Sequence, residues 1–82
     1  MISHPGPELR KMIEKTGDRQ AAVARGVGVT TKHLNRILQG HALPSVTLAI
    51  ELSRYLDADP HEVWRLVADY QLDQALNEGG GA

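Results

Sequence analysis

The sequence predicts an all-α fold of five helices that form a single domain in a chain of 82 residues. No segment alternates apolar and polar residues with the period of two that a half-buried strand requires. Apolar residues recur instead at spacings of three and four, and glycines and prolines divide the chain into segments of helical length. Because the chain has no cysteine, disulfides cannot stabilise it, and helix packing or a partner subunit must do so.

The first helix is expected over residues 7–15, where Leu9, Met12 and Ile13 form one apolar face. Gly17 can end this helix, because glycine readily adopts the left-handed conformation that follows many helices.

The second helix begins at Asp18 or Arg19, and Asp18 is the better N-cap because its carboxylate can accept from free backbone N–H groups. Small residues such as Ala21 and Ala24 permit close approach to the next helix. Gly28 is suited to the turn that follows.

The third helix is predicted from Thr30, its N-cap, to Gly40. A helix advances about 100° per residue, so Leu34, Ile37 and Leu38 share one arc. The opposite arc carries only hydrogen-bonding side chains, namely Thr31, Lys32, Asn35, Arg36 and Gln39.

The fourth helix is predicted to begin at Pro44-Ser45, with Ser45 as N-cap. Its expected core face consists of Leu48, Ala49, Leu52 and Leu56. Asp59-Pro60 repeats the start signal for a fifth helix that reaches Leu76 or Asn77. The domain therefore covers residues 1–78, and the glycine-rich residues 79–82 are expected to form a flexible tail.

The second and third helices, about residues 19–40, have the layout of a helix-turn-helix, whose second helix enters the major groove of DNA. Lys32 and Arg36 can donate to guanine, Asn35 can pair with adenine, and Thr31 can contact thymine. These four are the predicted base-reading residues. Any surface helix has a polar face, so the interpretation depends on the preceding helix, the glycine turn and the local charge.

Four further residues are predicted to contact DNA phosphates. Arg19 and Gln20 lie at the start of the second helix, where free N–H groups and the helix dipole favour an anion. Thr30 and Gln39 lie at the two ends of the third helix. Ordinary solvation is the alternative for each of them.

The net charge of −1 conceals an asymmetry between the two halves of the chain. Residues 1–40 contain seven basic and three acidic residues, a net of +4, whereas residues 41–82 contain two and seven, a net of −5. The positive half coincides with the helix-turn-helix, as binding to polyanionic DNA requires. The two signs indicate two surfaces with different partners.

The fifth helix has two apolar faces. One face, with Val63, Leu66, Val67 and Tyr70, can close the core. The other is predicted to form a homodimer interface, because helix-turn-helix proteins commonly pair to span half-sites roughly 34 Å apart. Its residues are Trp64, Ala68, Leu72, Ala75 and Leu76. The alternative is a bend that buries both faces within one chain.

No pattern indicates an enzyme, a cofactor or a metal. The four histidines lack zinc-ligand spacing, the serines lie in no nucleophile motif, and no glycine loop suits a phosphate. No apolar run approaches the ~20 residues that span a bilayer, and no signal-peptide pattern is present. We therefore expect a cytoplasmic protein with no membrane or small-molecule partner.

The sequence resembles the lambda-repressor-like, or Cro/C1-type (XRE), helix-turn-helix family over about residues 7–67. The matching positions are Gln20, Ala24, Gly28, Leu34, Ile37, Leu38 and Gly40, and Pro44-Ser45 continues the match. The resemblance implies a compact five-helix repressor domain that binds operator DNA, usually as a dimer. It also implies base contacts by Thr31, Lys32 and Arg36, and a phosphate contact by Gln20.

A narrower resemblance is to the antitoxin HigA group. His4-Pro5-Gly6 is similar to the opening motif of that group, and the segment 64–72 is similar to its closing motif, from which Val67 and Gln71 depart. Gly26 also departs, since it stands where a long polar residue is usual. This resemblance implies a toxin partner, a HigB-like mRNA-cleaving ribonuclease, and autorepression of the operon. The alternatives are a phage or chromosomal repressor without a toxin, and a protein-interaction module that no longer binds DNA.

Overall fold

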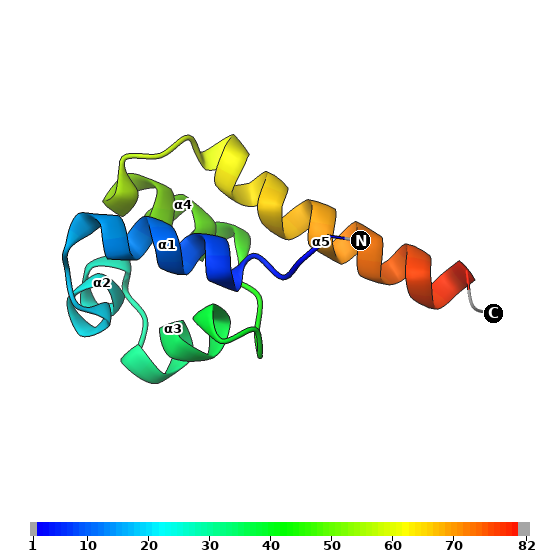
Figure 1. Cartoon of the computed structure of the whole chain (residues 1–82). Coiled ribbons are helices and arrows are strands. Elements are labelled where there is room, and N and C mark those ends of the chain that lie inside the picture. Colours follow the sequence, from blue (N-terminus) through cyan, green and yellow to red (C-terminus); the bar gives the residue numbers. More distant parts are fainter. Residues whose placement is uncertain (1, 81–82) are drawn as a thin grey trace.

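Five helices account for most of the chain in a computed structural model that describes residues 2–80. They are α1 (Gly6–Thr16), α2 (Gln20–Val27), α3 (Thr31–Leu38), α4 (Val46–Leu56) and α5 (Pro60–Gly80). The first four helices form the body of the domain, and the C-terminal half of α5 projects from that body (Figure 1). Residues 2–80 contain no strand, which confirms the all-α prediction. None of the helices in this range is long and apolar enough to cross a membrane.

The hydrophobic core lies where α1, α2, α3, α4 and the first half of α5 meet. Leu9, Leu34 and Leu52 are fully buried there, as the apolar spacing predicted, and Val23 of α2 is buried with them. Val63 and Val67 of α5 are also buried, whereas Leu72 and Leu76 are exposed. The core thus uses one face of α5 and leaves the other face of this helix uncovered.

The helix-start signals in the sequence are confirmed at α3 and α4. The Thr30 hydroxyl accepts from the His33 N–H, and the Ser45 hydroxyl accepts from the Leu48 N–H. Both bonds satisfy a backbone donor that the helix itself leaves free.

The expected N-cap of α2 is wrong. Arg19, not Asp18, occupies that position, and no side chain caps the helix. The Asp18 carboxylate instead accepts a hydrogen bond from the hydroxyl of Tyr55, a residue at the end of α4. A partner 37 positions away therefore takes the group that would otherwise cap the helix locally.

The last helix is longer than the sequence predicted. It continues through Gly79 and Gly80, which the sequence assigns to a tail, while residues 81–82 lie outside the described residues. Glycine costs only about 1 kcal/mol relative to alanine within a helix, so an established helix can extend through it where no proline intervenes.

Candidate nucleic-acid interface

Helix α3 presents one apolar and one polar face, as its sequence predicted. Leu34 and Ile37 are completely buried, and Leu38 is nearly so. They pack toward α1 and α2, which contact α3 from the inner side. The packing leaves the opposite face of α3 at the surface of the domain (Figure 1).

The four predicted base-reading residues lie together on that outer face. Thr31, Lys32 and Arg36 are exposed, and Asn35 is half-buried. Within residues 2–80 the ion pairs are Lys11–Glu8 and Arg54–Glu51, so neither Lys32 nor Arg36 is neutralised by a carboxylate. The structure therefore brings two unpaired cations and two neutral hydrogen-bonding side chains onto one exposed surface, which we call the α3 polar face.

The start of α3 is held by Thr30. Its Oγ1 accepts from the His33 N–H over 3.0 Å, and its carbonyl accepts from the Leu34 N–H. Thr30 is exposed, and its hydroxyl hydrogen remains available to a second acceptor. The residue can thus cap the helix and donate to a phosphate oxygen at the same time.

The start of α2 has an open end that suits an anion. Arg19 is exposed and Gln20 is half-buried, and no side chain caps the first turn. Free N–H groups and the positive end of the helix dipole attract negative charge at such a position. Because the Asp18 side chain does not cap α2, the free N–H groups of its first turn remain available to an anion.

The other end of α3 closes through a glycine. Gly40 has a φ of 87°, and the His41 N–H donates to the Arg36 carbonyl over 2.8 Å while the Gly40 N–H donates to the Ile37 carbonyl. These two bonds constitute a Schellman motif, which needs a residue that tolerates a positive φ. Gln39 stands exposed beside this turn.

A clamp formed by His4 and Gly6 also fixes the end of α3, and sequence analysis did not identify its role. The His4 ring donates from Nε2 to the Ala42 carbonyl over 3.0 Å and accepts from the Gly6 N–H at Nδ1 over 2.9 Å. A Cβ atom on Gly6 would lie 2.6 Å from the Ile37 carbonyl oxygen. The start of α1 therefore lies directly against the last turn of α3. The His4-Pro5-Gly6 motif was visible in the sequence, but its contact surface was not.

Tyr55 holds α2 against α4 in a comparable way. The hydrogen bond to Asp18, partial desolvation and the Asp18 charge raise the pKa of the Tyr55 hydroxyl above its usual value of 10.0. A Cβ atom on Gly26 would lie 2.6 Å from Cε2 of the Tyr55 ring. With the Tyr55 ring in this position, a long polar residue at position 26 would require the ring to move.

The predicted dimer residues follow one side of α5. Trp64 and Ala68 are half-buried, and Trp64 packs against the edge of the core. Leu72, Ala75 and Leu76 are exposed. Sequence analysis did not include Val46 and Ile50 of α4, which are also exposed and lie near Trp64 in a shared groove. Their spacing of four, away from the core face of α4, was the available signal.

Among residues 2–80, no three His, Asp or Glu side chains gather closely enough to hold a metal ion.

Comparison with known proteins yields one family match. A sequence model described as helix-turn-helix matches residues 9–63, from the first turns of α1 to the first turn of α5. A search of curated proteins found no match to the chain.

Proposed function

Because the chain belongs to the Cro/C1-type helix-turn-helix family of DNA-binding transcriptional regulators, we propose that it represses transcription by binding a specific operator as a dimer. The observation that carries this proposal is the α3 polar face, which exposes Lys32 and Arg36 without a competing carboxylate among the described residues. A helix with such a face can enter the major groove and read base edges.

Each base-reading side chain has a distinct task in this mechanism. Arg36 donates two hydrogen bonds to guanine O6 and N7, and Lys32 donates to a second guanine. Asn35 accepts from and donates to an adenine edge, and the Thr31 methyl group packs on thymine or its hydroxyl bonds to a base. Arginine and asparagine give the strongest discrimination because their contacts are bidentate.

The phosphate contacts set the orientation of α3 in the groove. Gln20 and the open end of α2 meet one phosphate, with Arg19 beside them, and Thr30 and Gln39 meet the backbone at the two ends of α3. These contacts contribute affinity without sequence preference. The cap at Thr30 and the clamp at Gly6 keep α3 rigid, so little ordering is needed on binding.

The second copy in the dimer is proposed to contact the uncovered side of α5. Leu72 and Leu76 are 60% and 64% exposed and lie one turn apart on the same side of α5, so a partner surface could cover both together. Pairing through α5 presents two α3 helices to successive half-sites, roughly 34 Å apart.

We also propose that the protein is an antitoxin of the HigA type that neutralises an mRNA-cleaving, HigB-like toxin and represses its own operon. The support is that the two motifs of the resemblance, distant in sequence, contact each other in space. The His4 ring lies edge-on to the Tyr70 ring, with centroids 5.0 Å apart, and just outside the two motifs the Ile2 N–H donates to Asp73. The opening and closing motifs thus form one structural unit beside α3.

Co-expression with the adjacent gene tests both parts of the proposal. We expect a stable complex of the two proteins, and protection of a palindromic segment of upstream DNA. The double variant Lys32→Ala/Arg36→Ala should lose the DNA protection and keep the complex. Protection without any complex would leave a repressor with no toxin. A complex without DNA binding at any salt concentration would contradict the repressor function.

A further inference from the structure

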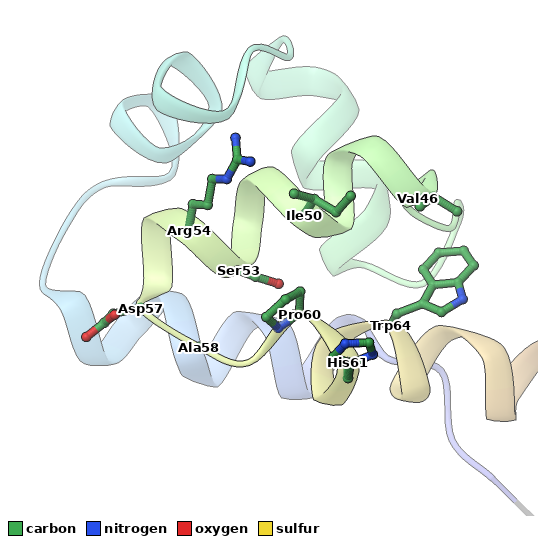
Figure 2. Close-up of a pocket in the computed structure, with 9 residues that line it drawn as sticks. All are labelled: Val46, Ile50, Ser53, Arg54, Asp57, Ala58, Pro60, His61 and Trp64. Atoms are coloured by element: carbon green, nitrogen blue, oxygen red, sulfur yellow. The ribbon is translucent and has the colours of Figure 1, made fainter.

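An open apolar groove lies between α4 and the start of α5 (Figure 2). Its volume is about 590 Å³. Val46 and Ile50 of α4 form one wall, and the Trp64 ring, which projects from α5 beside Val46, forms the other. Pro60 lines the groove near the beginning of α5. The groove can therefore accept aliphatic side chains.

The exposed apolar side chains of the domain gather around this groove and along one stripe of α5. Apart from Ile2, the exposed large hydrophobic residues among those described are Val46, Ile50, Leu72 and Leu76. At about 100° per residue, Trp64, Ala68, Leu72 and Leu76 form a continuous stripe on α5. The stripe begins at the groove and ends on the projecting half of the helix (Figure 1).

The groove and the leucines lie at opposite ends of one helix, so a second copy in antiparallel orientation can satisfy both. If α5 of the second copy crosses at Ala68, its Leu72 faces Trp64 and its Leu76 faces Pro60. The small Ala68 side chains, half-buried in each domain, then meet at the closest approach of the two helices. A parallel arrangement would instead place leucine beside leucine and leave both grooves empty.

The charges beside the stripe favour the same orientation. Arg65 and Asp69 are exposed and lie on the same side of the stripe. In the antiparallel register centred on Ala68, Arg65 of one copy lies within one helical turn of Asp69 of the other. The twofold symmetry produces this opposite-charge contact twice, and it brings the two Asp69 side chains equally close once, so two attractions oppose one repulsion. A parallel register would instead bring Arg65 beside Arg65 and Asp69 beside Asp69.

We propose that the groove between α4 and α5 binds Leu72 and Leu76 of a second copy of this chain, in an antiparallel register centred on Ala68. The proposal rests on the dimer of the proposed function and adds α4 to its interface. The same face of each domain thus provides both the groove and the two leucines that enter the partner's groove, as an isologous interface requires.

Single-cysteine cross-linking tests the register, because the chain has no native cysteine. Ala68→Cys places two thiols next to the symmetry axis, where the Cα atoms can reach the roughly 4.4–6.8 Å that a disulfide needs. We expect mild oxidation to convert most of this variant into covalent dimer. Ala75→Cys is the matched control, since its two thiols would lie roughly 21 Å apart along the helix axes and should not cross-link.

Sedimentation of the full chain without DNA tests the groove itself. Ile50→Glu should raise the dimer dissociation constant by more than about tenfold, because it places a charge against the partner leucines. Thr47→Glu, on the same helix but outside the groove, should leave that constant unchanged.

The outcomes separate this proposal from the proposed function. A wild-type chain that remains monomeric on and off DNA would overturn dimerisation itself. A stable dimer in which the Ala75→Cys variant cross-links faster than the Ala68→Cys variant, or in which Ile50→Glu has no effect, would overturn only the groove and its register. Loss of toxin binding in Ile50→Glu with an intact dimer would assign the groove to the toxin and likewise overturn the proposal.

Discussion

The hydroxyl of Tyr55 donates a hydrogen bond of 2.6 Å to Oδ2 of Asp18 and thereby joins the end of α4 to the segment that precedes α2. The same ring lies so close to Gly26 that no larger residue fits there without displacement. The first helix of the helix-turn-helix is thus fixed to α4 at two points. Its position relative to α3 depends on a contact that is remote in sequence.

This contact predicts a specific pH dependence of stability. Because Asp18 raises the pKa of Tyr55 in the folded state, folding favours the protonated phenol. The stabilisation is complete below the unfolded pKa of about 10 and is lost as pH rises through the higher folded value. Urea unfolding from about pH 8 to about pH 11 should therefore show a steeper alkaline loss for the wild type than for Tyr55→Phe. Tyr70→Phe, the control, should retain the wild-type loss, and identical profiles for wild type and Tyr55→Phe would contradict the contact.

Gly6→Ala should destabilise the domain, because the added methyl group would approach the carbonyl oxygens of Ile37 and Leu38 to within 2.6 and 2.8 Å. Overpacking of this kind lowers the free energy of unfolding by about 1–3 kcal/mol. Chemical denaturation measures the change. Ser3→Ala, at an exposed position in the same segment, should stay within about 0.5 kcal/mol of the wild type. An equally small change in the free energy of unfolding for Gly6→Ala would contradict the close contact between the start of α1 and the last turn of α3.

Leu72→Glu should give a folded monomer with weakened operator affinity. Leu72 is 60% exposed in the single chain, so the substitution leaves the core intact and places a charge in the proposed interface. Circular dichroism should be unchanged, while sedimentation should show the monomer. Gln74→Glu, an exposed position on the same helix with the same charge change, should remain dimeric. An unchanged dimer in Leu72→Glu would move the interface to another surface.

Arg36→Ala should weaken operator binding by about 1–3 kcal/mol and relax the base preference at one position of each half-site. Competition binding against a set of single-base operator variants measures both effects. Arg25→Ala removes the same charge from an exposed position of α2, outside the α3 polar face, and should leave the base preference unchanged. A uniform loss over all operator variants would make Arg36 a phosphate contact instead.

Local signals explain which parts of the fold the sequence could predict. Thr30 and Ser45 cap their helices through a donor three residues later, a relation that a short segment contains completely. The exposure of Thr31, Lys32 and Arg36 follows from the position of Leu34 and Ile37 on the opposite side of the same helix.

The parts that could not be predicted depend on distant partners. Asp18 is a good N-cap by its own chemistry, but in the fold its carboxylate accepts a hydrogen bond from Tyr55, and Arg19 occupies the N-cap position. His4 and Gly6 stood out as a motif, but their function depends on the turn after α3. The groove at Val46 and Ile50 similarly needs α5 for its second wall.

The affinity of the full chain for upstream DNA as a function of salt concentration tests the central claim most directly, with a scrambled duplex of equal length and composition as the reference. The account predicts tighter binding to the operator than to the scrambled duplex. It also predicts that the logarithm of affinity falls linearly with the logarithm of salt concentration, with a slope near −0.9 for each phosphate neutralised. Binding that is independent of salt, or equal for the two duplexes, would contradict operator recognition by α3.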